Sequence, residues 1–242
     1  MPDACDFSLV LPMYNEELNV EPVVEALLQA LRGAGALFEL LVVDNGSRDS
    51  TREKILGLAE RHPEVRLVIV PVNEGYGWGV RAGFEAARGA AVGWMPGDGQ
   101  IAPADVVRCW ARFAPGDVDM AKAERISRGD GWKRWLVSRV WNVTFRLLFA
   151  QAAEDVNGTP KIFWRRHLTW LNLRQKDWFI DAELMLKLRG RGARIAQVPI
   201  EFHPRREGRS NVRLRTVLEF YCNLALYSMR YWWGRITGKG LV

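Results

Sequence analysis

Cysteine and histidine are scarce in this chain. Its 242 residues include three of each, and the cysteines, Cys5, Cys109 and Cys222, lie far apart. No two cysteines form a CxxC motif and none clusters with histidine, so neither a disulfide framework nor a zinc site is expected. Widely spaced, reduced thiols favour a cytoplasmic protein.

A long apolar run is also missing. No stretch of about 18 uncharged apolar residues, the length that spans a bilayer, occurs in the sequence. The nearest approach, residues 217–233, is interrupted by Glu219 and Arg230. A predicted strand begins close to the N-terminus, so we expect neither a signal peptide nor a membrane span.

Motifs of three other enzyme classes are absent. No Gly-x-Ser-x-Gly elbow indicates a serine hydrolase. The glycine-rich stretch 75–79 does not have GxGxxG spacing and does not follow the first predicted strand, which disfavours a dinucleotide site. The first strand also lacks a glycine-rich phosphate loop, which disfavours a nucleotidyltransferase.

The composition allows a sizeable core and indicates anionic partners. Apolar residues make up 48% of the chain and aromatic residues 11%, which is enough for one large domain. The formal net charge of +6 favours binding of nucleotide phosphates or anionic lipid. Nucleic acid is disfavoured, because the basic residues form no known recognition motif.

Strand and helix patterns alternate through the first half, which predicts an α/β fold with a mostly parallel sheet. The second half is less regular and begins with a tryptophan-rich amphipathic pattern near residues 132–149. We expect one domain over residues 1–211, followed by an aromatic and basic segment, 212–242. The predicted strands are 7–11, 40–43, 65–70, 91–95, 161–164 and 194–202, and the predicted helices are 20–33, 51–61, 79–88, one opening at Pro103, and 181–189.

Two predicted strands end at a carboxylate. The run 41–43 stops at Asp44 and turns on Asn45 and Gly46, and the run 92–95 is followed by Asp98 and Gln100. Ligands of open α/β sheets bind outside the carboxyl ends of the strands. Two carboxylates at that edge suit a sugar nucleotide with a divalent cation.

Segments 11–17, 44–51 and 73–75, together with Asp98, resemble family 2 glycosyltransferases. The resemblance covers residues 7–211 and is greatest to the polyprenyl-phosphate glycosyltransferases, such as dolichol-phosphate mannosyltransferase. It implies a GT-A fold, which is a Rossmann-like sheet flanked by helices. It also implies residues that bind the nucleotide sugar: Pro12, Tyr14, Glu16, Asp44, Asn45, Asp98, Gln100 and Arg205.

The motif that holds the metal in this family is incomplete here. Pro96 stands where the family usually has its first aspartate, and Asn45 stands where an aspartate is commonest. The resemblance leaves Asp98 and Gln100 as metal ligands. Mg²⁺ or Mn²⁺ can be held by one carboxylate, one amide oxygen, donor phosphates and water, so we expect weak metal binding without the donor.

Basic residues of the second half suit a phosphate acceptor. Arg134 and Ser138 are four residues apart on a predicted helix and share a face. Arg125 is expected at the end of a strand, and Arg205 opens a polar loop. Arginine forks and a hydroxyl recognise a phosphate monoester, and in the family these four residues match positions that bind acceptor phosphate and donor diphosphate. The alternative is a solvated basic face.

The acceptor decides whether a catalytic base is needed. A phosphate is already an anion and attacks the anomeric carbon without strong help, whereas an alcohol requires a carboxylate base. The candidate bases are Asp181 and Glu183, with Asp155 in reserve. The first interpretation is an inverting transferase acting on a polyprenyl phosphate; the alternatives are an alcohol acceptor and a catalytically silent module that binds nucleotide sugars.

The C-terminal segment combines aromatic and basic residues. Its apolar run lies within residues 217–233, and arginines and lysines surround it. Tryptophan and tyrosine settle at a headgroup boundary, where basic residues meet anionic lipid. We expect a helix that lies on the inner face of the membrane, and the alternative is an ordinary core helix.

Overall fold

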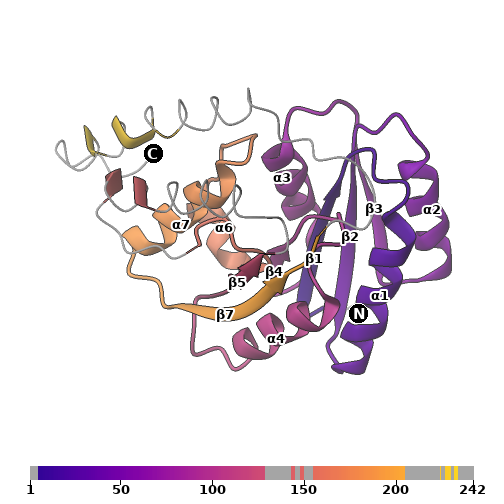
Figure 1. The fold of residues 1–242 in the computed structure, drawn as a ribbon, viewed down its shortest axis with the longest axis horizontal. Coiled ribbons are helices and arrows are strands. Elements are labelled where there is room, and N and C mark those ends of the chain that lie inside the picture. Colours follow the sequence, from indigo (N-terminus) through magenta and orange to yellow (C-terminus); the bar gives the residue numbers. More distant parts are fainter. Residues whose placement is uncertain are drawn as a thin grey trace.

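The fold is known from a computed structural model that describes residues 5–128, 143–144, 148–149, 155–204, 224, 227–229 and 232–233. Within these residues, seven strands form one sheet (Figure 1). The strands are β1 (Phe7–Met13), β2 (Phe38–Asn45), β3 (Val65–Val70), β4 (Ala91–Trp94), β5 (Met120–Arg128), β6 (Lys161–Trp164) and β7 (Ile195–Phe202). The helices are α1 (Val20–Gly33), α2 (Thr51–Arg61), α3 (Tyr76–Ala86), α4 (Pro103–Phe113), α6 (Leu168–Leu171) and α7 (Ile180–Gly190), with a 3₁₀ turn, η1 (Arg165–His167).

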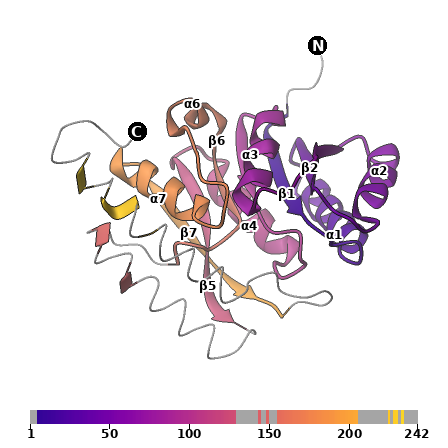
Figure 2. The same cartoon turned by 90° about the horizontal axis from the view of Figure 1, so that it is seen from above.

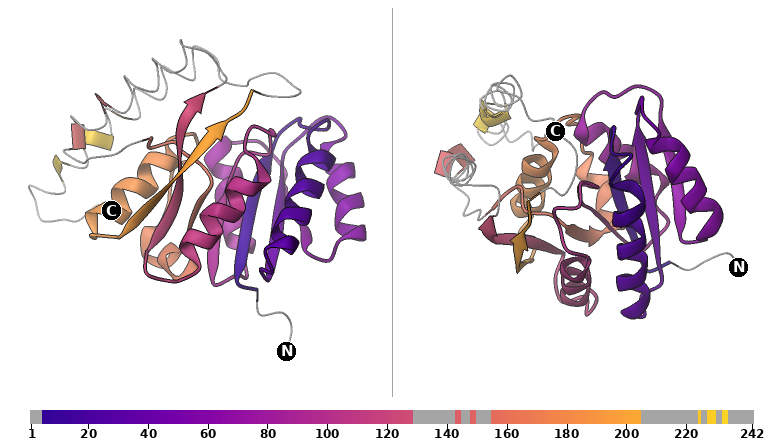
Figure 3. Two further views of the ribbon diagram at one scale, coloured as in Figure 1. Left: turned by 60° about the horizontal axis from the view of Figure 1, so that its bottom comes forward. Right: turned by 45° about the vertical axis from the view of Figure 1, so that its right-hand side comes forward.

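The sheet is mixed, with the strand order β3-β2-β1-β4-β6-β5-β7. Strands β1 to β4 pair in parallel. Strand β6 is antiparallel to both of its neighbours, β4 and β5, whereas β5 and β7 run side by side in parallel (Figure 3). Figure 2 shows β1 and β2 with α1 and α2 toward one end of the molecule, and β5 and β7 with α7 toward the other. The prediction of a mostly parallel α/β sheet is confirmed.

Helices cover both faces of the sheet, which makes three layers. Alternate residues of β1 divide between two cores: Leu9 and Leu11 pack with α1, α2 and α4, and Val10 packs with α3, α6 and α7. All seven residues of β1 are buried. A strand buried on both faces is apolar throughout, and this explains why the first predicted strand is a continuous apolar run.

Most predicted elements have the expected type and position. Helix α2 and strands β3 and β6 have the predicted bounds. Arg125 was expected at the end of a strand, and that expectation is wrong: Arg125 lies inside β5, because pairing with β7 continues to Arg128 opposite Phe202. The tryptophan-rich pattern 132–149 falls largely outside the described residues.

The glycine-rich start of α3 is explained by a close crossing of two segments. Gly75 has φ 127°, and a Cβ on it would overlap the carbonyl oxygen of Lys176. A Cβ on Gly77 would lie 2.6 Å from the carbonyl oxygen of Asp177. Trp78 donates its backbone N–H to the Lys176 carbonyl at 3.0 Å. The glycines therefore allow segment 175–177 to pack on α3, and the helix begins at Tyr76 rather than at the predicted Gly79.

Gly83 marks a close contact between α3 and β1. We expect Gly83→Ala to destabilise the fold by about 1–3 kcal/mol, because overpacking a core strains it and the added Cβ would overlap a methyl of Val10. In the matched control Gly57→Ala, on α2, the new Cβ meets nothing within 4 Å. That change is expected to stabilise by about 0.5–1 kcal/mol through helix propensity. Urea unfolding measures both, and equal effects would contradict the packing assigned to Gly83.

Candidate functional site

The carboxyl edge of the parallel strands gathers the predicted acidic residues. Met13, the last residue of β1, is the register partner of Asp44 near the end of β2. Asp98 follows the neighbouring strand β4, which pairs with β1. The Asp44 side chain is fully buried, and Asp98 is nearly so. A buried carboxylate requires a partner, so each one at this edge has a specific role in structure or binding.

Asp44 is held on both of its oxygens. Oδ1 accepts the backbone N–H of Ser47 at 2.9 Å, and Oδ2 accepts Nε–H of Arg52 at 2.6 Å. Arg52 comes from the first turn of α2, and its side chain is about half exposed.

The turn after β2 needs glycine at position 46, where φ is 75° and a Cβ would lie 2.8 Å from the backbone nitrogen of Asn73.

The loops after β1 and β2 are joined by side-chain hydrogen bonds. Ser47 Oγ accepts the backbone N–H of Asn15 at 3.1 Å, and Asn15 Oδ1 accepts the backbone N–H of Arg48 at 2.9 Å. Thr51 Oγ1 accepts the backbone N–H of Glu16 at 2.9 Å. These bonds fix the rim of the site before any ligand binds. The sequence interpretation missed this role of Asn15, Ser47 and Thr51, and their polar residue types in loops were the available signal.

Three residues predicted to bind the nucleoside lie on the loop after β1 or in the strand itself. Pro12 is buried in β1, Tyr14 is half-buried, and Glu16 is 9% exposed. Glu16 Oε2 accepts Nδ2–H of Asn19 at 2.6 Å. Glu16 is therefore nearly buried and lies before α1, which begins at Val20.

Asn45 lies on the other face of the sheet from Asp44, because consecutive side chains of a strand alternate. Its Nδ2 donates to the carbonyl oxygen of Gly75 at 3.0 Å. A Cβ on Gly79 would lie 3.0 Å from Asn45 Cγ. Asn45 thus connects β2 to the start of α3.

Asp98 and Gln100, the predicted metal ligands, share one tight turn. Asp98 Oδ1 accepts the backbone N–H of Gln100 at 3.2 Å. Gln100 Nε2 donates to the carbonyl oxygen of His203 at 2.9 Å, and the His203 N–H donates to the Gln100 carbonyl at 3.0 Å. The side chain and the backbone of Gln100 are thus both bonded to the backbone of His203.

Asp98 and Gln100 supply oxygen atoms of the kind that a hard divalent cation binds, but they supply only part of its coordination shell. Carboxylate and amide oxygens are ligands that Mg²⁺ and Mn²⁺ take. Within the described residues, no group of three or more histidine, cysteine, aspartate or glutamate side chains converges to hold a metal. A cation at Asp98 and Gln100 would therefore need oxygens from the substrate and water.

Two lysines are buried beside this edge. Lys122 and Lys161 are register partners across the antiparallel pair of β5 and β6, and both are fully buried. Burial lowers the pKa of Lys122 to about 8. Burial likewise lowers the pKa of Lys161 and raises that of Asp181, its ion-pair partner. Like charges placed opposite each other are destabilising, so this pair depends on nearby carboxylates.

Arg125 and Asp155 form a second ion pair at the same edge. The Arg125 Nε–H donates to Asp155 Oδ2 at 2.8 Å, and Nη2 bonds the other oxygen. Although burial opposes it, the Arg125 guanidinium lowers the pKa of the Asp155 carboxyl to about 2. Phe202 lies under the guanidinium, 5.3 Å from carbon Cζ to the ring centre.

Several predicted positions cannot be placed. Arg134, Ser138 and Arg205 lie outside the described residues, as does the proposed domain boundary at residue 211. The described part of the C-terminal segment has two faces. Leu224 and Tyr227 are buried in the core shared with α7, whereas the large side chains Met229, Trp232 and Trp233 are exposed.

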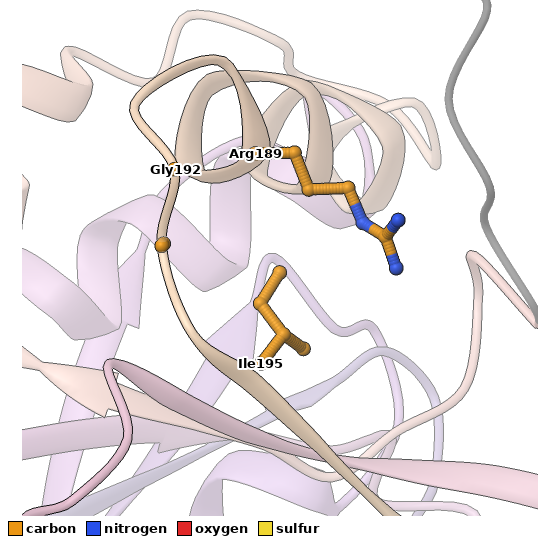
Figure 4. Close-up of a pocket in the computed structure, with 4 residues that line it drawn as sticks. Arg189, Gly192 and Ile195 are labelled. Atoms are coloured by element: carbon orange, nitrogen blue, oxygen red, sulfur yellow. The ribbon is translucent and has the colours of Figure 1, made fainter.

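A hollow between the end of α7 and the start of β7 is lined by Arg189, Gly192, Ala193 and Ile195 (Figure 4). Ile195 is the register partner of Met120, at the start of β5. Met120 in turn faces Phe163, near the end of the antiparallel β6. The hollow therefore opens at the opposite edge of the sheet from Asp44 and Asp98, and it is not part of the candidate site.

The fold and this edge define a class. A three-layer α/β domain, with one carboxylate at the end of β2, another after β4 and an antiparallel strand inserted beyond β4, is a GT-A type glycosyltransferase domain. The chain belongs to glycosyl transferase family 2, whose sequence profile matches residues 8–177. The predicted family membership is confirmed.

Curated relatives are enzymes that act on lipid phosphates, by their names. An undecaprenyl-phosphate 4-deoxy-4-formamido-L-arabinose transferase of Pectobacterium atrosepticum is 32% identical over 174 residues, covering 71% of this chain and 52% of the relative. A dolichyl-phosphate beta-glucosyltransferase (ALG5C) of Trichomonas vaginalis is 25% identical, covering 81% and 63%. The chain spans about half the length of the first of these relatives.

Solved structures share the fold. Glucosyl-3-phosphoglycerate synthase from Mycobacterium tuberculosis, in complex with Mn²⁺, UDP and glucosyl-3-phosphoglycerate, superposes with a TM-score of 0.68 at 21% identity. The superposition covers 96% of this chain and 80% of the synthase. At this identity the likeness concerns the fold.

The Lys161–Asp181 pair is expected to dominate local stability. Asp181→Ala should cost about 3–5 kcal/mol, because it leaves a buried charge without its partner. The double variant Lys161→Met/Asp181→Leu removes both charges and should recover most of that loss. Asp117→Ala, which breaks a surface pair with Arg112, is the control and should change little. Urea unfolding measures all three, and a double variant as unstable as the single one would refute the assignment.

Proposed function

We propose that this chain transfers a sugar from a UDP- or GDP-linked donor to a polyprenyl phosphate, with inversion, at the cytoplasmic face of a membrane. One observation carries the proposal: every candidate base near the edge is already committed to another group. Asp181 pairs with Lys161, and Asp155 with Arg125. Glu183 pairs with Lys187 at 2.7 Å and accepts the backbone N–H of Arg174.

That arrangement favours an acceptor that needs no base. An alcohol must lose a proton as it attacks, so an alcohol transferase holds a carboxylate ready to accept it. A phosphate acceptor is already ionised, and its enzyme has to offset repulsion between two anions. Lys122 and Lys161 are the lysines buried beside the edge, and Lys161 shares its charge with Asp181.

The proposal of a nucleotide-sugar donor rests on the acidic residues at the carboxyl edge of the sheet. Asp44 and Asp98 lie at the end of the sheet that carries β1, β2 and β4, where α/β folds bind nucleotides. Asp98 and Gln100 would hold Mg²⁺ or Mn²⁺, which neutralises the leaving diphosphate when bound. The structural neighbour crystallised with Mn²⁺ and UDP supports this choice of donor and cation.

The names of the curated relatives support a polyprenyl phosphate as the acceptor. Their names specify undecaprenyl phosphate and dolichyl phosphate. A small-molecule acceptor is the second candidate, since the structural neighbour is bound to glucosyl-3-phosphoglycerate. The third candidate, a silent binding module, is suggested by Pro96 in the metal motif.

The metal assignment predicts unequal effects of two variants. Asp98→Ala should reduce transfer on the order of 10²–10³-fold, because it removes the carboxylate that stabilises the leaving diphosphate through the cation. Gln100→Ala should reduce it less. Transfer is measured with Mn²⁺, a panel of UDP- and GDP-sugars and undecaprenyl phosphate, and thermal unfolding confirms that each variant is folded. Normal turnover of Asp98→Ala at saturating donor would refute the assignment, and transfer to 3-phosphoglycerate alone would favour the second candidate.

Membrane docking is the remaining part of the proposal. In the part of the chain that the structure describes, no helix is both long and apolar enough to cross a bilayer. Of the residues that the structure describes there, Leu224 and Tyr227 pack on the core, as the core-helix alternative expects, whereas Met229 and Trp233 are exposed. Exposed aromatic residues with basic neighbours in sequence suit a headgroup boundary.

Binding to vesicles tests this surface. The full chain is expected to co-sediment with phosphatidylglycerol vesicles at low salt and to dissociate as salt rises, because basic residues supply part of the attraction. Met229→Ala/Trp233→Ala should weaken binding several-fold. Leu56→Ala, another exposed apolar residue, on α2, is the control and should not. Equal binding of all three proteins would argue against docking through this face.

A further inference from the structure

We propose that the outer edge of β3 pairs with β3 of a second copy of this chain. The two copies then form a closed two-fold dimer, in which one sheet continues from one copy into the other. The inference does not depend on the proposed function, because it rests on a strand edge and on the outer side of α2, both at one end of the molecule (Figure 1).

Strand β3 is the terminal strand of the sheet, and half of its backbone groups point outward. The Leu40 N–H donates to the carbonyl oxygen of Glu64 at 2.8 Å. In a parallel ladder this bond sets the alternation, so that every second residue from Arg66 onward bonds β2. The N–H and C=O groups of Leu67 and Ile69 therefore point away from the sheet, and no backbone or side-chain group of the described residues bonds them. Such a row of unpaired groups is a template for another strand.

The side chains of β3 leave this edge unprotected. Proteins protect edge strands with charged side chains, proline or bulges. The one charged residue of β3 is Arg66, and its guanidinium is turned inward to the Glu39 carboxylate and the Ala86 carbonyl oxygen. Ile69, in contrast, is 52% exposed. The edge is thus apolar as well as unpaired, which favours its burial against another strand.

The other terminal strand, β7, is blocked. The Met120 N–H donates to the carbonyl oxygen of Arg194, and the alternation that follows along the ladder turns Pro199 outward. Proline has no N–H to offer, and the Pro199 carbonyl oxygen already accepts Nη2–H of Arg108 at 2.6 Å. Each chain therefore has one open edge among its described strands, which allows a closed pair but not a filament.

Helix α2 presents an apolar residue on the same side. Its Lys54 and Arg61 both lie against Glu21 of α1, and α1 packs between α2 and α4, toward the middle of the sheet. At 3.6 residues per turn, Leu56 projects from the flank of α2 opposite to Lys54 and Arg61. Leu56 is 49% exposed. It therefore faces the space beyond β3, where a second copy would lie.

The flank of α2 is complementary to itself. Antiparallel pairing of two β3 strands places the two-fold axis perpendicular to the sheet, near the middle of β3. Leu56 lies about 7 Å before the end of α2, and Leu67 lies about 7 Å after the start of β3, so the two residues are nearly level. The axis then brings the Leu56 side chains of both copies together. Arg52 and Glu60, both exposed and each four residues from Leu56, come to lie opposite Glu60 and Arg52 of the second copy. This complementarity of charge points to a second copy rather than to an unrelated peptide.

The symmetry preserves the two faces of the sheet. A two-fold axis perpendicular to the sheet turns the α3 and α7 side of both copies in the same direction. Leu224 and Tyr227 belong to the core on that side. The dimer therefore presents the C-terminal segments of both copies to one surface.

Sedimentation velocity of the full chain over a range of concentrations tests the inference. The unmodified chain should form a dimer. Ile69→Lys should raise the dissociation constant of the dimer at least ten-fold, because a lysine on the open edge opposes strand pairing. Ile126→Lys is the matched control: it makes the same change at a 66% exposed residue of β5, and it should dimerise as the unmodified chain does. Glu60→Arg, on the surface of α2, should weaken the dimer several-fold by placing like charges opposite each other, and added salt should reduce this effect.

Each other outcome overturns the inference. A chain that stays monomeric as concentration rises has no such interface. A dimer that Ile69→Lys and Glu60→Arg leave unchanged is formed by another surface, and so is one that Ile126→Lys weakens equally. Assemblies that grow beyond the dimer would contradict the closed arrangement. Thermal unfolding shows whether each variant is folded, and if Ile69→Lys does not fold, Glu60→Arg decides between these outcomes.

Discussion

Antiparallel pairing of β6 with β4 is the contact on which the site depends. Because β6 runs opposite to β4, its first residue, Lys161, lies beside Trp94 at the carboxyl edge. A parallel strand at this place would bring its last residue there instead. The reversal also aligns β5 so that Lys122 faces Lys161. The acidic half of the edge, built by β1, β2 and β4, thus meets a cationic half built by β5 and β6.

Burial determines how these charges can act. A charge taken out of water is costly unless it is paired, and the fully buried Lys161 pairs with Asp181. The same requirement commits Asp155 to Arg125 and Glu183 to Lys187. Carboxylates that compensate buried cations are poor proton acceptors for a substrate. The edge is therefore better suited to stabilising anions than to removing protons, which connects the packing of the second half to the choice of acceptor.

The two halves of the molecule are also joined by backbone contact. Segment 175–177 packs against the start of α3, where Gly75 and Gly77 leave room for its carbonyl oxygens. The Tyr76 ring stacks on Trp178, with centres 4.0 Å apart. Asn45, at the end of β2, donates a side-chain hydrogen bond to the carbonyl oxygen of Gly75 at the start of α3. The side of the sheet that carries β2 and α3 and the side that carries α7 thus form one continuous packed body.

The sequence alone was enough to predict the order and type of most elements and the position of Asp44 and Asp98 at strand ends. Those features follow from local patterns: apolar runs, helical periodicity and turn residues act within a few positions of one another. The family resemblance rests on the same short segments, and the matching profile confirms it.

Only the tertiary structure determined the partners of the charged groups. Asp181 lies twenty residues from Lys161, and Asn15 lies thirty-two residues from Ser47, separations at which no periodic pattern carries information. The role of glycines 75 and 77 likewise depended on a segment about a hundred residues away. Strand pairing brings such residues together, and burial then fixes which charges must be joined. Local preferences thus determine which elements form, whereas the sheet order and the cost of burying charge determine what the elements bring together.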